Sequence, residues 1–317
     1  MSFDIQYLLW LQQLRVATGG IFDELFNALS KFAVDILPFL PFVVFWGVDK
    51  RWGYIFLTNQ WVGEVMNGFI KLTVCAYRPW IRSDLIEPAG DSKVAATGYS
   101  FPSGHTTVAT IMYGTTFVWQ KDKRRWLAVT CAVLLLLTGF SRNFLGVHTP
   151  QDVAVGFLAS SIMIAIVLTV SRKVEGNEKV VDILTLVGIL ATILVLIYIQ
   201  VKPYPMEFTA DGALLVDPQK MMNDTFKGCG AFMGFLIGSY VERHYIHYEI
   251  PVGAKNLPMM VCAGAALALA WKELFAPATI VLMFGGHWGN FIARCMMTLF
   301  AVWFWPIMIQ KECKEVA

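Results

Sequence analysis

Long apolar stretches separated by short charged stretches run through most of the chain. A helix that crosses a bilayer needs about 20 mostly apolar residues, and nine stretches between the charges approach this length, although several are short or contain polar residues. We predict spans at 34–49, 53–76, 103–120, 126–145, 151–171, 181–201, 228–242, 256–274 and 288–309. The pattern therefore predicts an all-α, polytopic membrane helix bundle.

The first 33 residues show a different pattern, in which large apolar side chains are mixed with charges such as Asp4 and Arg15. An amphipathic stretch of this kind lies along a membrane surface rather than across it, so we expect residues 1–33 to form an interfacial segment. Residues 34–201 then form a six-helix core. Residues 202–317 form a C-terminal extension of about three further transmembrane helices.

Basic residues collect in the loops on one side of the predicted bundle. They follow the first, third and fifth spans: Lys50, Arg51, Lys121, Lys123, Arg124, Arg125, Arg172, Lys173 and Lys179. The positive-inside rule makes this side cytoplasmic, so the loops at 77–102, 146–150 and 202–227 face outward. We expect an integral membrane protein of a bacterial plasma membrane, because nothing in the sequence resembles an organelle signal; an endoplasmic-reticulum membrane is the alternative.

Composition supports the membrane and excludes several other classes of protein. Hydrophobic residues make up 56% of the 317 residues and charged residues 15%, against about 25% charged in a typical soluble domain. The net charge of +2 gives no indication of a nucleic-acid partner. The six cysteines lie mostly in apolar stretches without C-x-x-C spacing, and no Asp/Glu cluster suits magnesium. The sequence therefore predicts neither a metal nor another cofactor.

Three polar clusters interrupt the apolar pattern, and the first follows the second span. Lys71 and Arg78 are seven residues apart, which is about two helical turns, so both side chains can lie on one face. Two cations at a membrane boundary suit a multiply charged anion. The alternative is that both side chains extend toward lipid headgroups.

The second cluster lies where a loop enters the third span. Pro102 favours a helix start, and Ser103 and Gly104 would leave backbone N–H groups available for an anion at the helix N-terminus. His105 could donate a proton to a leaving group. An ordinary helix cap is the alternative interpretation.

The third cluster lies between the fourth and fifth spans. Arg142 offers a planar set of donors that matches phosphate oxygens. His148 and Asp152 are four residues apart, so a helical turn brings them together, and an acceptor on one ring nitrogen leaves the other nitrogen available for attack. Thr149 followed by Pro150 is also a good helix start, and this cap is compatible with the catalytic interpretation.

The predicted topology places all three clusters on the outward face of the membrane. Their combined positive charge suits a phosphate dianion and the charge that spreads over its oxygens in a transition state. This convergence predicts a phosphate site on the non-cytoplasmic side.

The clusters resemble the three signature motifs of the type-2 phosphatidic-acid phosphatase superfamily, which also includes vanadium haloperoxidases. The motifs are K-x6-RP, PSGH and SR-x5-H-x3-D, and they are matched here by Lys71, Arg78 and Pro79, by Pro102, Ser103, Gly104 and His105, and by Ser141, Arg142, His148 and Asp152. Every signature position is matched. The resemblance covers roughly residues 20–200 and implies an all-α bundle.

The resemblance also implies a role for each matched residue. His148 would attack phosphorus and form a phosphohistidine, Asp152 would orient His148, and His105 would protonate the leaving group before water hydrolyses the intermediate. The residues expected to hold the phosphoryl oxygens are Lys71, Arg78, Ser103, Gly104 and Arg142. The implied substrate is a phosphomonoester or pyrophosphate of a lipid, and the implied partners are this lipid and the bilayer.

Three alternative functions use the same pocket. A phosphotransferase would pass the phosphoryl group to an alcohol instead of water, and the sequence does not separate it from a phosphatase. A vanadate-binding oxidase fits poorly with a chain that is buried in a membrane. A non-catalytic lipid-phosphate binder or transporter would not need the intact His148, Asp152 and His105.

The C-terminal extension offers weaker signals. Gly230, Gly234 and Gly238 form a small-residue face that lets helices approach closely, either within the chain or at the seam of a homodimer. His287 lies in a glycine-rich interruption that suggests a re-entrant turn or, as an alternative, a substrate contact. Trp80 follows the first motif and suits an interfacial anchor or a contact with a lipid headgroup.

Overall fold

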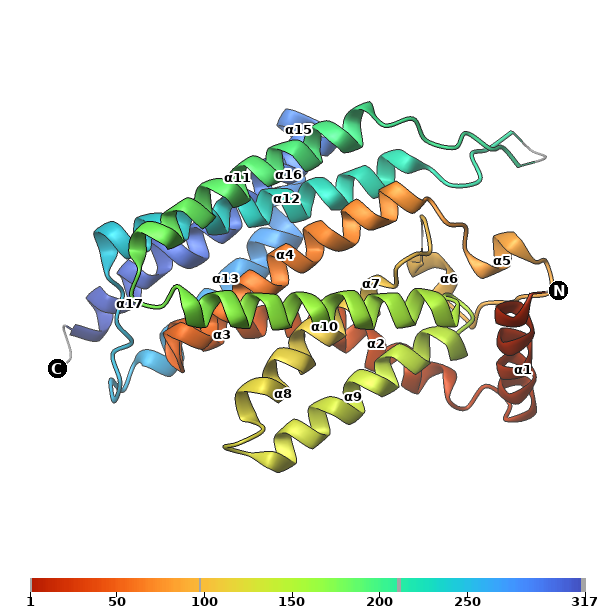
Figure 1. The fold of residues 1–317 in the computed structure, drawn as a ribbon, viewed down its shortest axis with the longest axis horizontal. Coiled ribbons are helices and arrows are strands. Elements are labelled where there is room, and N and C mark those ends of the chain that lie inside the picture. Colours follow the sequence, from red (N-terminus) through yellow and green to blue (C-terminus); the bar gives the residue numbers. More distant parts are fainter. Residues whose placement is uncertain (1, 97, 210–211, 315–317) are drawn as a thin grey trace. The chain divides into compact units, whose positions relative to one another are not determined.

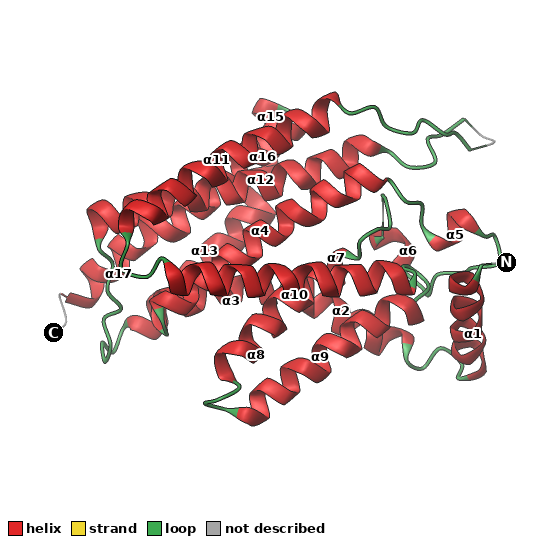
Figure 2. Cartoon of the chain, in the orientation of Figure 1, coloured by secondary structure: helices red, strands yellow, loops and turns green. Residues whose placement is uncertain are grey.

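The computed structural model describes residues 2–96, 98–209 and 212–314. Within these ranges the chain forms helices joined by turns and loops (Figure 2), and no β-strand is present in them apart from one isolated bridge between Phe208 and Leu214. The predicted all-α class is confirmed.

The chain divides into two compact units, each built from segments that are distant in the sequence. The first comprises Met1–Pro38, Met66–Ala165 and Lys202–Met221, and the second comprises Phe39–Val65, Ile166–Val201 and Met222–Ala317. Three long helices each pass from one unit into the other: α4 (Lys50–Val74), α10 (Pro150–Lys173) and α12 (Pro218–Val241). The units therefore alternate along the sequence. Figure 1 labels the helices, coloured by their place in the sequence.

The remaining helices of the first unit are mostly short. They are α1 (Phe3–Ala17), α2 (Asp23–Asp35), α5 (Pro79–Arg82), α6 (Ser92–Ala95), α7 (Gly104–Ala109), a π-helical turn (Thr110–Gly114), α8 (Thr115–Gln120) and α9 (Arg125–Phe144). Close packing at two glycines joins α7, α9 and α10. A Cβ at Gly156 would lie 3.0 Å from the carbonyl oxygen of Ser103, and one at Gly139 would lie 3.1 Å from the Val153 side chain.

Prolines and a capping hydroxyl explain where several helices begin. Pro79, Pro150 and Pro218 are the first residues of α5, α10 and α12, where the missing N–H costs nothing. Ser103 caps α7, because its Oγ accepts the backbone N–H of Thr106 at 3.3 Å. The predicted helix start at the second polar cluster is confirmed.

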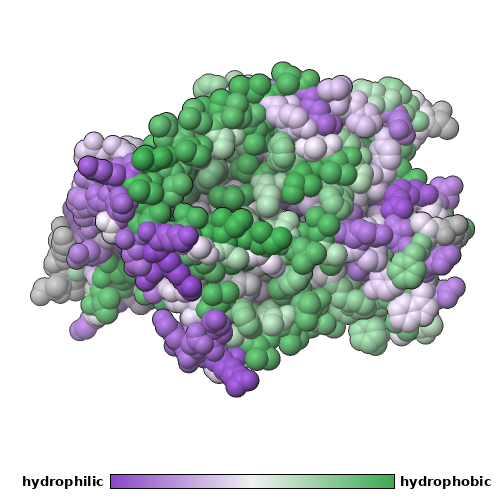
Figure 3. Space-filling view, viewed as in Figure 1, coloured by the Kyte–Doolittle hydropathy of each residue, from purple (hydrophilic) through white to green (hydrophobic). Residues whose placement is uncertain are grey.

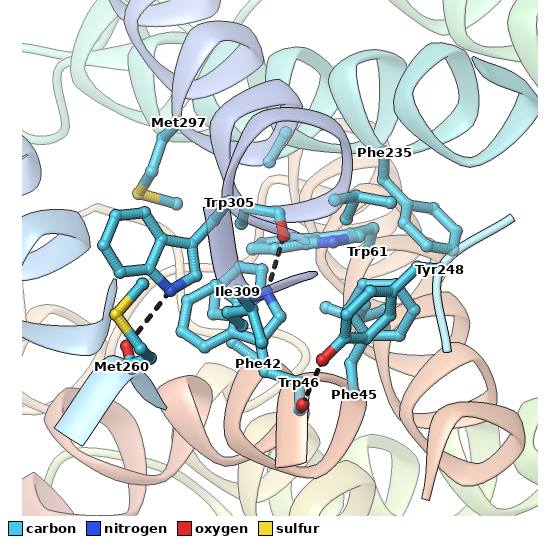
Figure 4. Packing of buried hydrophobic residues seen from close by; sticks show 14 of the residues in the cluster. Phe42, Phe45, Trp46, Trp61, Phe235, Tyr248, Met260, Met297, Trp305 and Ile309 are labelled. Atoms are coloured by element: carbon cyan, nitrogen blue, oxygen red, sulfur yellow. Dashed lines mark hydrogen bonds between the residues drawn. The ribbon is translucent and has the colours of Figure 1, made fainter. Parts of the chain in front are cut away.

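The second unit contains the remaining helices of the chain. They are a 3₁₀ turn (Leu37–Phe39) that leads into it, α3 (Leu40–Gly47), α11 (Glu178–Val201), α13 (Leu257–Ala270), α14 (Ala276–Ala278), α15 (Ile280–Phe284), α16 (Gly286–Leu299) and α17 (Trp305–Lys314), with π-helical turns at Glu242–Ile246, Trp271–Phe275 and Phe300–Phe304. Its core is rich in aromatic residues (Figure 4). Trp46 and Trp305 each bury an indole and satisfy its N–H with a carbonyl, that of Ala301 at 2.7 Å and that of Met260 at 3.1 Å.

The glycine face of α12 is used inside the chain. A Cβ at Gly230 would lie 2.1 Å from the carbonyl oxygen of Phe291, and one at Gly234 would lie 2.3 Å from that of Cys295. Only glycine allows α12 and α16 to approach this closely. The structure therefore accounts for the glycine face by packing within the second unit.

Six segments among the described residues are long and apolar enough to cross a membrane. They are Asp23–Gly47, Arg125–Phe144, Pro150–Lys173, Glu178–Val201, Leu257–Phe284 and Gly286–Cys313. They correspond to six of the nine predicted spans. The other three predicted spans are mostly helical too, as α4, as α7 to α8 and as α12, but they are shorter or more polar. Figure 3 shows apolar side chains over the visible surface of α10 and α11, as expected for lipid-facing helices.

The N-terminal boundary differs from the prediction. The first candidate span begins at Asp23, so residues 23–33, which we expected to lie in the interface, continue into that span instead. Charged residues at both ends of α2 made this stretch look amphipathic in the sequence, although the residues between them are largely apolar. In α1, Phe3 and Trp10 remain exposed while Leu8 is buried, an arrangement that still suits an interfacial helix.

Candidate active site

Three segments of the first unit meet at the predicted polar clusters: the end of α4, the loop before α7, and the turn between α9 and α10. Lys71 on α4 donates from Nζ to the carbonyl oxygens of Tyr99 at 3.1 Å, Ser100 at 3.4 Å and Pro102 at 2.8 Å. The backbone N–H of Ser103 donates to the carbonyl of Asp152 at 3.0 Å. The structure therefore brings the three sequence motifs together.

The turn that carries His148 depends on a glycine. Gly146 has φ +73°, a left-handed conformation that favours glycine. The carbonyl oxygen of Arg142 accepts the backbone N–H groups of Val147 and His148, both at 3.2 Å. This turn follows α9 and places His148 two residues before Pro150, the first residue of α10.

His148 is buried, and its two ring nitrogens have different surroundings. Nε2 lies 2.8 Å from Nη1 of Arg78, whereas Nδ1 lies 3.4 Å from Oδ2 of Asp152 and 3.4 Å from Oγ of Ser100. Arginine has only donors, so Nε2 must be the acceptor and the proton belongs on Nδ1. The contacts thus favour the tautomer in which the lone pair is on Nε2.

The carboxylate of Asp152 is held by several donors. Its Oδ2 accepts from Ser100 Oγ at 2.5 Å and from the backbone N–H of Thr149 at 2.8 Å. In return, the backbone N–H of Asp152 donates to Thr149 Oγ1 at 3.3 Å. This reciprocal pair is a capping box, so the predicted cap at Thr149 is confirmed and it fixes the carboxylate beside His148.

Arg78 is buried and spans two loops. Its Nε donates to the carbonyl of Gly98 at 3.0 Å and its Nη1 to the carbonyl of Val147 at 2.9 Å. Its guanidinium lies 5.8 Å from the ring centroid of Trp80. Burial lowers the pKa of Arg78 to about 10 and the nearby Asp152 opposes this shift, so the side chain stays cationic at neutral pH.

Burial also lowers the pKa of His148 well below its ordinary value of 6.5, and the positive charge of Arg78 acts in the same direction. Asp152 opposes both effects through its hydrogen bond and charge. His148 is therefore neutral near pH 7, which is the state that a nucleophile requires.

Gly104 and His105 begin α7 and are only partly buried, in contrast to His148. A Cβ at Gly104 would meet only Oδ1 of Asn67 within 4 Å, at 3.8 Å. The backbone is therefore open to a close approach here. His105 has the access to the site surface that a proton donor needs.

Arg142 is buried near the end of α9. Its Nη1 donates to Ser30 Oγ of α2 at 2.8 Å. In the described part of the chain its Nε has no hydrogen-bond partner. A buried guanidinium with a remaining donor suits an anion.

Two polar residues near the site were missed by sequence reasoning. Ser100 donates to Asp152, and Asn67 donates from Nδ2 to Thr107 Oγ1 at 2.9 Å beside Gly104. Asn67 lies four residues before Lys71, and this spacing is the one signal that could have found it. Nothing in the sequence pattern distinguishes Ser100 from other loop hydroxyls.

His287 lies in the second unit. Its Nδ1 is 2.6 Å from Oδ1 of Asn223, and its ring stacks on Phe226 at 5.2 Å. Gly285 has φ +78° and separates α15 from α16. The predicted interruption in this glycine-rich segment is confirmed as a break between two helices, and a role for His287 in substrate binding stays a prediction.

The fold and the site together define an integral membrane protein with a histidine–aspartate pair inside a cluster of basic side chains. Residues 52–175 match the PAP2 superfamily. This segment carries all three motifs, and the match confirms the family resemblance stated from them.

Parts of the chain are similar in sequence to three named phosphatases. Sphingosine-1-phosphate phosphatase 2 of Mus musculus is 23% identical over 225 residues, which cover 68% of this chain and 58% of that protein. Phosphatidylglycerophosphatase B of Bacillus subtilis is 26% identical over 146 residues, 43% of this chain and 69% of that protein. Undecaprenyl-diphosphatase of Sulfolobus acidocaldarius is 22% identical over 163 residues, 51% of this chain and 75% of that protein. The match thus spans less than two thirds of the mouse protein. No solved structure gives a significant match.

Proposed function

We propose that this protein is a metal-independent phosphatase that hydrolyses a phosphomonoester or pyrophosphate of a lipid through a phosphohistidine on His148. One observation carries the proposal: Nε2 of the buried His148 faces Arg78 while Nδ1 faces Asp152. A nucleophile thus lies next to a cation that would bind the phosphate, with an acceptor on its opposite side.

In the first step, the lone pair of His148 Nε2 attacks phosphorus and the bond from phosphorus to the leaving oxygen breaks. His105 donates a proton to that oxygen, so the lipid alcohol or phosphate leaves protonated. Asp152 stabilises the positive charge that develops on the imidazole. In the second step, water attacks phosphorus, the P–N bond breaks, and the proton of the water passes to His105.

The phosphoryl oxygens would be held by basic side chains and backbone donors. These are Lys71, Arg78 and Arg142, together with the start of α7 at Ser103 and Gly104. Donors placed before the substrate arrives stabilise the spreading negative charge without reorganisation. Arg78 would move its Nη1 from His148 Nε2 to a phosphoryl oxygen, which exposes the nucleophile when substrate binds.

A lipid is the proposed substrate because the site belongs to a membrane-spanning chain. The name of each of the three relatives contains a lipid that carries phosphate or pyrophosphate. The basic loops of the sequence favour a site that faces the non-cytoplasmic side. Both assignments are part of the proposal.

The test is phosphate release by the purified protein in detergent micelles that contain EDTA. Phosphatidic acid, phosphatidylglycerol phosphate, undecaprenyl pyrophosphate and sphingosine phosphate are the substrates, with His148→Ala as the matched variant. We expect release by the wild type and none by the variant. Release that requires added Mg²⁺ would overturn metal independence, and a folded protein that releases nothing would overturn the phosphatase.

The same assay distinguishes a phosphotransferase. An added alcohol, such as glycerol, competes with water for the phosphohistidine. Radiolabelled phosphate that appears on glycerol in preference to water would identify a transferase, whereas free phosphate as the main product supports a hydrolase.

A further inference from the structure

A cavity of about 220 Å³ opens between the first turns of α4 and the last turn of α10, inside the second unit. Arg51, Trp52, Ile55, Leu168 and Arg172 line it. None of these residues belongs to the three motifs of the candidate active site, so the cavity needs its own explanation.

The lining combines an apolar floor with a cationic rim. Ile55 and Leu168 are buried, whereas Arg51 and Arg172 are exposed. Trp52 is half-buried between these two environments. Indole rings are enriched at the boundary between lipid and water, and guanidinium groups bind phosphate oxygens in planar pairs of hydrogen bonds.

The cavity also lies where an apolar span ends. α10 is a candidate membrane span that carries both Arg172 and Lys173 in its last turn. A ligand that fits this position has an apolar part beside Ile55 and Leu168 and an anionic part at the arginines. Inorganic phosphate satisfies only the second requirement.

The acidic groups near the cavity leave Arg51 and Arg172 able to bind an anion. Glu175 pairs with Arg51 at 2.6 Å, but both side chains are more than half exposed, and such ion pairs are weak in water. The Asp49 carboxylate accepts the backbone N–H of Trp52 at 3.0 Å and thereby caps α4. Glu175 is therefore the acidic group that competes for the rim.

We propose that this cavity binds the headgroup of an anionic glycerophospholipid from the adjoining leaflet. The phosphodiester accepts hydrogen bonds from Arg51 and Arg172, and the glycerol backbone and upper acyl chain pack on Ile55, Leu168 and Trp52. The site is a structural lipid site, independent of the proposed phosphatase reaction.

Native mass spectrometry of the full-length protein, released from mixed micelles with phosphatidylglycerol, measures retained lipid. Arg172→Gln is the test variant and Lys173→Gln is its control, because both remove one exposed positive charge and only Arg172 lines the cavity. We expect retention to weaken about fivefold or more in Arg172→Gln and less than about twofold in Lys173→Gln.

Glu175→Gln gives a change in the opposite direction. Removing the competing carboxylate leaves Arg51 for the lipid, so we expect retention to strengthen by about twofold or more. Thermal unfolding in the same detergent verifies that each variant is folded. Lipid bound at the candidate active site would be retained equally by all three variants.

Three further ligands separate the sources of binding. Phosphatidylcholine tests the need for net negative charge, and glycerophosphoglycerol and inorganic phosphate test the need for acyl chains. Equal losses in Arg172→Gln and Lys173→Gln would show diffuse surface attraction and overturn the site. Binding of inorganic phosphate as tight as that of phosphatidylglycerol would overturn the lipid as its ligand.

Discussion

Asp152 has hydrogen-bond donors from a side chain, a backbone and an imidazole within 3.4 Å. Asn in its place would keep an oxygen for the cap. It would lose the charge that fixes the tautomer of the neutral imidazole and stabilises the positive charge that develops on the ring during the reaction. We expect Asp152→Asn to lower kcat by about 10²-fold or more. Phosphate release at saturating substrate measures the effect, and circular dichroism verifies the fold.

Ser100→Ala is the milder change at the same carboxylate. It removes one hydrogen bond to a charged acceptor and leaves the donors from His148 and Thr149. We expect a loss of about tenfold in kcat. If Ser100→Ala equalled Asp152→Asn, the hydroxyl itself would have a direct role in the reaction.

The lowered pKa of His148 predicts how the protein responds to acid. In the folded protein the pKa of His148 lies well below 6.5, whereas in the unfolded chain it is near 6.5. As the pH falls through 6.5, the unfolded chain therefore takes up a proton before the folded protein does. Stability is therefore lost as the pH falls below 6.5, because the unfolded state binds more protons. The thermal unfolding midpoint should therefore decrease as the pH is lowered from 7.5 to 5. The decrease should be smaller in His148→Ala.

Activity should respond at a lower pH than for an ordinary histidine. The fall of kcat/KM at acid pH reports pKa values of the free enzyme. We therefore expect the part of this fall that is due to protonation of His148 to occur below pH 6.5. Arg78→Met removes a positive neighbour and should move that limb upward. An acid limb in Arg78→Met at or below the wild-type value would contradict this assignment.

At the scale of elements, α7 and α10 approach each other at Gly156. A Cβ there would lie 3.0 Å from the Ser103 carbonyl oxygen, which is backbone and cannot rotate away. We expect Gly156→Ala to displace the start of α7 and lower activity by about tenfold or more, since small misplacements at a reacting centre are costly. Gly114→Ala is the control, because its nearest neighbour is the end of the Ile164 side chain at 3.3 Å. It should retain most activity, and equal losses would show that the contact at Ser103 is unimportant.

Hydrophobic pattern predicted helices well and their boundaries less well. All nine predicted spans are mostly helical, because an apolar stretch in lipid must satisfy its backbone internally. The first candidate span begins at Asp23 and not at residue 34, because an apolar stretch lies between Asp23, Glu24 and Asp35. The π-helical turns, such as Thr110–Gly114, depend on packing and leave no signal in a hydropathy pattern.

At the scale of the molecule, the loops should divide between the two sides of the membrane. Asp84 lies in a loop predicted to face outward and Lys123 in one predicted to be cytoplasmic, and both belong to the first unit. In a background without exposed native cysteine, we expect an impermeant maleimide to label Asp84→Cys in intact cells. Lys123→Cys should react only after permeabilisation, and the reverse pattern would invert the proposed orientation.

The sequence predicted which residues meet at the site but not every residue that supports them. Lys71, Arg78 and Asp152 could be placed because their motifs are known. The expected helical spacing of Lys71 and Arg78 was wrong, because α4 ends at Val74 and Arg78 lies just before α5. Ser100 could not be placed, since its partner Asp152 comes from another segment and depends on how the loops fold over one another, and Asn67 had only its spacing from Lys71 as a signal.

The contact between Arg78 Nη1 and His148 Nε2 also affects how the protein reacts with general histidine reagents. Diethyl pyrocarbonate acylates an accessible, unprotonated ring nitrogen. His148 is neutral, but its lone pair is covered by a guanidinium, whereas His105 lies partly at the surface. Acylation mapped by peptide mass spectrometry should therefore reach the unprotonated fraction of His105 first and spare the nucleophile in the resting protein.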